Sequence, residues 1–268
     1  MATLGEQAVG SIVKLNVGGV ATNFIVVHQG LPGSMYDSSC DGTWLLMESI
    51  YEKRSMNSTQ SNDYEKNSIN TYLNNTFFGL FDDDAQGAIK QVKIPYRPGN
   101  GSSTTVSDGA NGLSTKVFLL STAECNYISE SDTATEGSVL DCFNGESTKR
   151  IAYYDGTATA WWTRSPRLTG FGGTMSAFIN GKGEILGTSA STVYGIRPAL
   201  ILPYELNVSD NGLVDGTIAS ARAITGSVNI GGELRELTGK GYINIGGELR
   251  ELCDAKINID GKLRSLKG

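Results

Sequence analysis

Residues 161–166 have the sequence Trp-Trp-Thr-Arg-Ser-Pro, and residues 195–203 have the sequence Gly-Ile-Arg-Pro-Ala-Leu-Ile-Leu-Pro. These apolar runs predict strands over 160–163 and 196–201. Adjacent strand residues point to opposite faces, so we expect one of the two tryptophans in the core and the other lining a surface. An arginine close to a proline suits a fixed salt bridge under a loop. The expected rigid frame consists of Trp161, Trp162, Arg164, Arg197 and Pro198.

The segment between these two stretches, residues 167–194, has a composition of its own. It is rich in Thr, Ser, Gly and aromatic residues, a mixture that suits an adaptable binding loop, as in antibody paratopes. Expected strands over 175–179 and 184–188 flank Asn180-Gly181, a dipeptide that favours a tight hairpin turn. The segment is therefore a candidate ligand-binding surface, and the alternative is an ordinary exposed hairpin. The candidate contact residues are Arg167, Phe171, Phe178, Asn180, Lys182 and Tyr194.

Turn signals and short apolar runs extend this pattern over most of the chain. The 268 residues include 34 glycines, well above the roughly 7% of average usage. Further strands are expected over 11–15, 23–28, 43–47 and 116–120. Short helices are expected over 68–75 with Ser68 as N-cap, over 85–92 after three aspartates, and from a capping box at 121–124 through Tyr127. The combination predicts an α+β fold, a β-rich domain with two or three short helices.

A polar, glycine-containing stretch follows Pro203, and the chain then repeats itself. Residues 228–237, Val-Asn-Ile-Gly-Gly-Glu-Leu-Arg-Glu-Leu, recur almost unchanged at 243–252, and a divergent third copy occupies 257–266. Each copy has a turn dipeptide at its centre, so each is expected to form a β-hairpin of roughly ten residues. We therefore expect a domain over residues 1–205, a linker over 206–225 and three tandem hairpins over 226–268.

These repeats are the expected site of attachment or self-association. A single hairpin is only marginally stable, so three in tandem are expected to share an apolar face or to pair between chains. The charge changes at the same boundary, because residues 221–268 carry a net charge of +2 and residues 1–220 one of −8. The residues expected to carry the attachment are Ile230, Leu234, Ile245, Leu249, Ile259 and Leu263.

Composition and charge exclude several classes of function. The net charge of −6 argues against a general nucleic-acid binder, which carries a basic patch or stripe. No run approaches roughly eighteen apolar residues, so no membrane insertion is expected, and residues 1–10 lack the features of a signal peptide. The single histidine, His28, and four cysteines without a C-x-x-C pair favour neither a metal site nor a cofactor.

The cysteines and acidic residues carry no catalytic pattern. Cys125 and Cys142 could form a disulfide, but buried free thiols are the expectation. Acidic side chains could supply the paired carboxylates of a glycoside hydrolase, yet no spacing selects two of them, and solvated loop and cap carboxylates are expected instead. The acidic residues in question are Glu124, Glu130, Asp132, Glu136 and Asp141.

Six sequence blocks occur in an order that resembles one family. They are residues 24–30, 42–47, 89–96, 112–116, 161–166 and 195–203, and the resemblance covers residues 11–204. The order resembles a domain of unknown function common in prophages and genomes of anaerobic Gram-positive bacteria. That domain is similar to the C-type-lectin and formylglycine-generating-enzyme superfamily. The resemblance implies a C-type-lectin-like fold in which residues 167–194 display the ligand-binding surface, as in the variable proteins of diversity-generating retroelements.

Two departures from that superfamily bear on activity. The copper-using formylglycine-generating enzymes need a cysteine pair late in the domain, and this chain has no cysteine between Cys142 and Cys253. The Glu-Pro-Asn and Trp-Asn-Asp calcium signatures of animal lectins are also absent. The resemblance therefore implies the scaffold and its display segment, without that enzymatic activity and without calcium-dependent sugar binding.

These observations predict a non-enzymatic bacteriophage virion structural protein, made in the host cytoplasm and located in the virion. Its first domain would present residues 167–194 to a host-surface glycan or protein. Its repeats would attach it to other capsid or tail proteins or join it into a homo-oligomer. The alternatives are a capsid or tail decoration protein with a purely structural role, and a glycan hydrolase.

Overall fold

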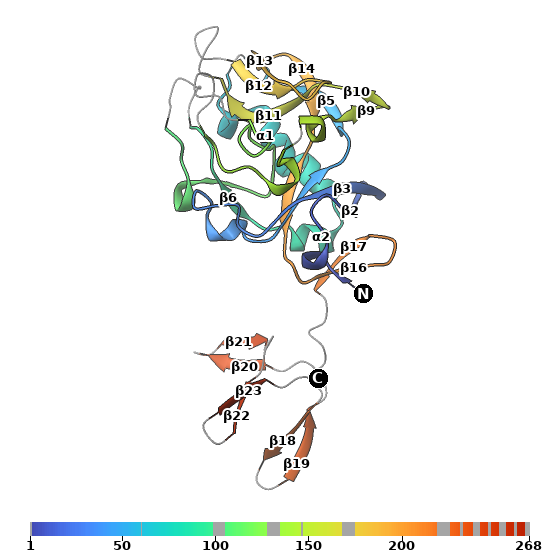
Figure 1. Cartoon of the computed structure of the whole chain (residues 1–268), viewed down its shortest axis with the longest axis vertical. Coiled ribbons are helices and arrows are strands. Elements are labelled where there is room, and N and C mark those ends of the chain that lie inside the picture. Colours follow the sequence, from blue (N-terminus) through green and yellow to red (C-terminus); the bar gives the residue numbers. More distant parts are fainter. Residues whose placement is uncertain are drawn as a thin grey trace. The chain divides into compact units, whose positions relative to one another are not determined.

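Two five-stranded sheets form the centre of the larger part of the chain in the computed structural model (Figure 1). The structure describes residues 2–59, 61–98, 105–127, 135–145, 147–167 and 175–218, together with six strands between residues 226 and 265. The chain divides into two compact units: Met1–Thr217, called the body, and Ile218–Gly268, called the tail.

The first sheet has the strand order β2-β3-β4-β15-β8, and all its pairs are antiparallel. Its strands are β2 (Ile12–Val17), β3 (Val20–Gln29), β4 (Thr43–Met47), β8 (Val117–Phe118) and β15 (Ala199–Leu202). β2 and β3 meet in a tight turn at Gly18 and Gly19, whose φ angles are 59° and 79°. Two-residue turns require such positive angles. Every residue of the central strand β4 is buried.

The second sheet has the order β13-β12-β11-β14-β5. Its strands are β5 (Glu52–Ser55), β11 (Trp161–Pro166), β12 (Met175–Ile179), β13 (Ile185–Ser189) and β14 (Val193–Ile196). β11 and β14 run parallel, and the other pairs are antiparallel. The single strand expected over 196–201 is therefore two strands, β14 and β15, one in each sheet. Arg197 and Pro198 separate them, since proline has no N–H for a ladder hydrogen bond.

Two short α-helices lie between strands in the first half of the chain. α1 (Ser68–Tyr72) has Asn67 as its N-cap, in place of the expected Ser68, and continues as a π-helical turn over Leu73–Phe77. α2 (Asp83–Ala88) begins after Asp82, whose carboxylate accepts a hydrogen bond from the N–H of Ala85 at 2.9 Å. It ends four residues before the expected boundary, because residue 92 already belongs to β6 (Val92–Ile94).

The capping box at 121–124 forms both of its hydrogen bonds but opens no helix. The Ser121 N–H donates to Glu124 Oε2 at 2.8 Å, and the Glu124 N–H donates to Ser121 Oγ at 3.0 Å. Asn126 then adopts a φ of 58°, a left-handed conformation that cannot continue a right-handed helix. The helix expected through Tyr127 is instead a run of turns.

The remaining elements of the body are short. β1 (Ala2–Thr3), β16 (Leu206–Val208) and β17 (Val214–Ile218) form a three-stranded sheet, so the stretch expected as a linker begins with two strands. β6 pairs with β7 (Leu113–Thr115), and β9 (Tyr153–Tyr154) pairs with β10 (Thr157–Ala158). Single 3-10 turns occupy Leu4–Glu6, Ser38–Cys40, Tyr64–Lys66, Phe78–Leu80, Gly109–Asn111, Asp141–Phe143 and Ser147–Arg150.

The body is thus β-rich with few short helices, and the predicted α+β class is confirmed at that level. Within the described ranges, no helix has both the length and the apolar character needed to cross a membrane.

In the tail, each sequence repeat forms one antiparallel two-stranded sheet. The pairs are β18 (Gly226–Ile230) with β19 (Glu233–Leu237), β20 (Tyr242–Ile245) with β21 (Glu248–Glu251), and β22 (Lys256–Ile259) with β23 (Lys262–Ser265). In the first hairpin Ile230 lies opposite Glu233, and Asn229 lies opposite Leu234. Directly opposite residues share a face, so the register places Ile230 and Leu234 on different faces. The other two hairpins repeat this register.

Candidate binding surface

Arg164 lies on β11 and forms a buried ion pair with Glu124. Its Nη1 donates to Glu124 Oε2 at 2.6 Å and its Nη2 donates to Oε1 at 2.7 Å, and neither side chain is exposed. Burial by itself lowers the pKa of Arg164, but the charge and hydrogen bonds of Glu124, together with the charge of Glu136, raise it overall. The fixed salt bridge expected for Arg164 is therefore present.

Further hydrogen bonds tie this ion pair to distant parts of the body. Arg164 Nε donates to the Pro95 carbonyl at 3.1 Å, and Nη1 donates to the Leu119 carbonyl at 2.9 Å. The Tyr36 hydroxyl donates to Glu124 Oε1 at 2.9 Å. Burial, and then the charge of Glu124, raise the pKa of Tyr36. These contacts fix β11 just before residue 167, where the predicted display segment begins.

Arg197, at the far end of that segment, is as buried as Arg164 but has a different environment. Its Nε donates to the Met47 carbonyl at 2.8 Å, and its guanidinium lies 5.2 Å from the centre of the Trp161 ring. Burial lowers its pKa to about 10. Among the described residues, no carboxylate lies within salt-bridge distance of Arg197. The salt bridge expected there is replaced by a carbonyl and an aromatic ring.

Both tryptophans of β11 are fully buried, so the expectation that one of them lines a surface is wrong. Trp161 contacts Arg197, as described above. Trp162 packs against two other rings, with centroids 6.2 Å from Phe178 and 5.1 Å from Tyr194, and its Nε1 donates to the Arg54 carbonyl at 3.0 Å. Other parts of the body cover both faces of β11, which the alternation within one strand does not reveal.

Phe178 and Tyr194 form a second layer over Trp162. Their ring centroids are 4.5 Å apart, and Phe178 is buried whereas Tyr194 is partly exposed. Phe178 lies opposite Leu186 of the edge strand β13, and Leu186 is 44% exposed. Phe178 therefore supports Tyr194 from beneath and is not itself on the surface, in contrast to the contact role expected for it.

The β12–β13 loop is one residue longer than the four residues, 180–183, that the expected strands leave between them. Ile179 lies opposite Ile185, so residues 180–184 form the loop. Asn180 Oδ1 accepts hydrogen bonds from the N–H groups of Lys182 at 2.9 Å and Glu184 at 3.0 Å. Asn180 therefore shapes the loop, and Lys182 is exposed at its tip.

Two predicted contact residues remain, Arg167 and Phe171. Arg167 is partly buried and covers Gly187 of β13, where a Cβ atom would come within 2.1 Å of Arg167 Cδ. Phe171 lies outside the described residues. Sequence reasoning missed Leu186 and the 58% exposed Val193, although the alternation of Ile185 with Leu186 is a signal for an outward residue. We call the partly or fully exposed residues of this segment, Arg167, Lys182, Leu186, Val193 and Tyr194, the display surface. Leu186 and Tyr194 lie on the face of the sheet that carries Phe178, and Val193 lies on the other face.

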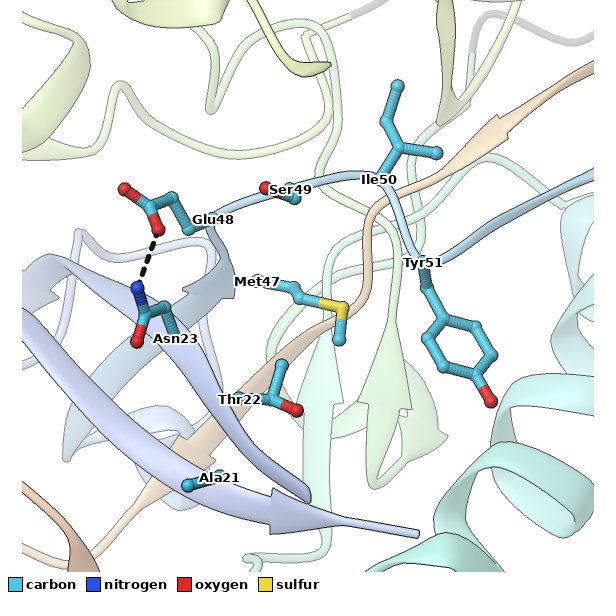
Figure 2. A pocket seen from close by; sticks show the side chains of 8 residues that line it. All are labelled: Ala21, Thr22, Asn23, Met47, Glu48, Ser49, Ile50 and Tyr51. Atoms are coloured by element: carbon cyan, nitrogen blue, oxygen red, sulfur yellow. Dashed lines mark hydrogen bonds between the residues drawn. The ribbon is translucent and has the colours of Figure 1, made fainter. Parts of the chain in front are cut away.

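A hollow of about 390 Å³ lies elsewhere in the body, between β3 and the segment that follows β4 (Figure 2). Asn23 Nδ2 donates to Glu48 Oε2 across it at 2.9 Å. The Tyr51 ring and the hydroxyls of Thr22 and Ser49 also line it. Amide, carboxylate, hydroxyl and aromatic groups are those that contact sugars. No motif marks these residues, so the sequence did not point to them.

The acidic residues considered for hydrolysis have diverse environments. Glu124 and Glu136 are buried, which corrects the expectation of solvated carboxylates. Asp141 is half-exposed, with Oδ2 2.9 Å from His28 Nδ1. Glu130 and Asp132 lie outside the described residues. The described part of the chain contains no group of three His, Cys, Asp or Glu side chains placed to hold a metal ion.

Three of the cysteines are buried free thiols, as expected: Cys40, Cys125 and Cys142. Burial raises the pKa of Cys40 to about 12, and it also raises the pKa of Cys125 and Cys142. Thiols that hold their protons are poor nucleophiles. Cys253 lies outside the described residues.

Comparison with protein families gives one match. The model of a domain of unknown function, DUF6273, matches residues 41–204. The match runs from just before β4 to just after β15, so it contains the whole predicted display segment, whereas β2 and β3 precede it. No curated protein and no solved structure matches the chain. Since the match covers more than half of the sequence, the chain belongs to the family of the domain of unknown function DUF6273.

Proposed function

We propose that this protein is a non-enzymatic structural protein of a bacteriophage particle. Its body, with a C-type-lectin-like fold, binds a glycan or protein on the host surface, and its tail attaches it to the particle. The observation that carries the proposal is the anchoring of residues 167–194 at both ends by the buried side chains of Arg164 and Arg197. A binding segment with fixed ends loses less conformational entropy when a ligand binds.

The chemistry of the display surface supports binding over catalysis. It combines two cationic side chains, Arg167 and Lys182, with two exposed aliphatic side chains and a tyrosine that packs on other rings. Tyrosine supplies a large, rigid contact with a polar tip, which suits both glycans and protein surfaces. The buried carboxylates serve the frame instead, because Glu124 is engaged by Arg164, Tyr36 and Ser121.

Binding of the full-length chain to intact Gram-positive cells tests the proposal. We expect Lys182→Ala combined with Tyr194→Ala to weaken binding at least about tenfold, since central aromatic and cationic contacts dominate binding energies. The matched control is Tyr153→Ala, which removes a 52% exposed tyrosine outside the display surface. It should bind like the parent chain, and thermal unfolding of each variant checks that the body stays folded. Unchanged binding by the double variant would contradict the proposal.

The hollow of Figure 2 is a second place where a glycan could be held, because the Asn23–Glu48 pair and Tyr51 both line it. Ser49→Trp would fill it from an exposed position. If Ser49→Trp abolished cell binding while the Lys182/Tyr194 variant kept it, the binding site would be the hollow and not the display surface.

A further inference from the structure

Among the described strands of the tail, each hairpin has an unpaired outer edge. Each is a two-stranded sheet, and the described strands of different hairpins do not pair with one another. A two-stranded hairpin is marginally stable in water without a further strand or a packing partner. The unpaired N–H and C=O groups of an edge strand form a template for another strand. A partner that supplies strands would satisfy these edges.

The second strands of the first two hairpins carry a distinctive charge pattern. Residues 233–235 and 248–250 are both Glu-Leu-Arg. Across its own hairpin, Glu233 lies opposite Ile230 and Arg235 lies opposite Val228. The second hairpin has the same arrangement. The register thus places no opposite charge across the hairpin from these glutamates and arginines.

Two-fold symmetry decides which register two such strands can share. In a symmetric antiparallel pair, opposite residues share a face, so one residue must lie opposite its own copy. Centring the pair on Glu233, Arg235 or Glu236 would oppose like charges. Centring it on Leu234 opposes Glu233 with Arg235 of the second copy, twice, and leucine with leucine. Opposite charges across strands stabilise a sheet and like charges destabilise it.

We propose that the tail joins two copies of this chain by antiparallel pairing of Glu-Leu-Arg strands, β19 and β21, in the register centred on Leu234 and Leu249. In this register each glutamate of the motif meets an arginine of the second copy. The occupant of these edges is a second copy of the tail because the charge pattern is complementary to itself.

The third hairpin marks the end of this pairing. Its second strand begins Lys262-Leu263-Arg264, and the same register would oppose lysine with arginine. Basic residues on an edge strand discourage further pairing. The first two hairpins therefore pair with a second copy, and the third does not. This goes beyond the function proposed above and does not depend on the ligand of the body.

A charge exchange in the full-length chain tests the register. One variant combines Glu233→Arg with Glu248→Arg, and the other combines Arg235→Glu with Arg250→Glu. Sedimentation equilibrium should show a dimer of the parent chain. We expect each variant alone to dissociate with a Kd at least about tenfold higher, because four attractive pairs become repulsive. An equimolar mixture of the two variants should recover the dimer, since every opposed pair is then complementary.

The matched control is Glu236→Arg with Glu251→Arg. It makes the same change of charge on the same strands, at positions that meet no charged residue in this register, and it should leave the dimer intact. Three results would overturn the proposal: a monomeric parent chain, two variants that do not recover when mixed, or a control that dissociates as much as the variants.

Discussion

At the scale of single residues, Arg164 and Arg197 show how one sequence feature leads to two environments. Both are buried arginines close to a proline. Arg164 has a bidentate carboxylate partner, and its pKa is raised. Arg197 has a carbonyl and a ring, and burial lowers its pKa to about 10. The sequence indicated that both arginines are fixed, but it could not indicate which carboxylate lies beside Arg164, because Glu124 is distant along the chain.

Because their partners differ, we expect substitution of the two arginines to lower the free energy of unfolding by different amounts. Arg164→Met leaves the Glu124 carboxylate buried without its counter-charge, which should lower the free energy of unfolding by about 3–5 kcal/mol. Arg197→Met leaves no buried charge behind, so we expect it to cost clearly less. Urea unfolding of both variants measures the difference. Equal costs would contradict this account of the ion pair.

The burial of Glu136 leads us to expect that the stability difference between the parent chain and a Glu136→Gln variant depends on pH. The Glu136 side chain is buried, and its Oε1 accepts a hydrogen bond from the backbone N–H of Arg97 at 2.8 Å. Burial raises the pKa of this carboxyl. The folded state therefore favours the neutral acid, so the parent chain loses stability as the pH rises through the folded-state pKa. The Glu136→Gln variant has no such loss. The difference in free energy of unfolding between Glu136→Gln and the parent should therefore move in favour of the variant as the pH rises above the ordinary pKa of a glutamate, about 4.3.

Urea titrations of the parent chain and of Glu136→Gln at each pH measure that gap. Glu205→Gln is the matched control, since it removes one negative charge from an exposed position. A gap for Glu136→Gln that stays flat or closes with rising pH would show that burial does not govern this carboxyl.

At the scale of elements, local sequence predicted the strands better than their connections. The expected bounds of β4 and β12 are those of the structure. Local signals failed where tertiary contacts decide. The strand expected over 196–201 divides because its two halves pair with different sheets. The β12–β13 loop is one residue longer than expected, and the side chain of Asn180 shapes it by accepting two backbone N–H groups.

Gly183, one of the two glycines of that loop, allows a prediction at this scale. Gly183 has a φ of 80°, and a Cβ there would come within 2.5 Å of the Ser147 carbonyl oxygen. We expect Gly183→Ala to cost about 3 kcal/mol or more, from the left-handed conformation together with the clash. Gly212 has nearly the same φ, 82°, but the Ile12 carbonyl oxygen is 3.7 Å away. Gly212→Ala should therefore cost only about 1 kcal/mol.

Thermal or urea unfolding of the two alanine variants provides the comparison. Because both substitutions impose the same backbone strain, the difference between them reports the clash at Ser147. If Gly183→Ala were no more destabilising than Gly212→Ala, the loop would not be held against residue 147.

At the scale of the whole molecule, the body and the tail were predicted from different features of the sequence. Composition and periodicity predicted a β-rich body, and the repeats predicted one hairpin per copy. The buried frame was harder to foresee, since Trp162 and Glu124 are covered by segments far away in the sequence. Which residues of the display surface are exposed depends on which of them these distant segments cover. Phe178 was therefore expected on the surface but is buried, and Leu186 was not expected there but is exposed.

The division into two units predicts that the body does not need the tail to fold. A chain that ends at residue 217 keeps both five-stranded sheets and most of β17. We expect it to unfold in one cooperative transition at nearly the same temperature as the body of the full chain, as compact single domains do. Calorimetry of both chains makes the comparison. A broad transition or a large loss of stability would show that the tail supports the body.

Immunogold electron microscopy of purified phage particles, with antibodies against the body, tests the central claim most directly. The account predicts label on the particle in a few copies at the tail tip, where a protein that binds the host surface must act. A regular lattice of label over the shell would contradict it in favour of a decoration protein, and particles without label would show that the protein is not part of the virion.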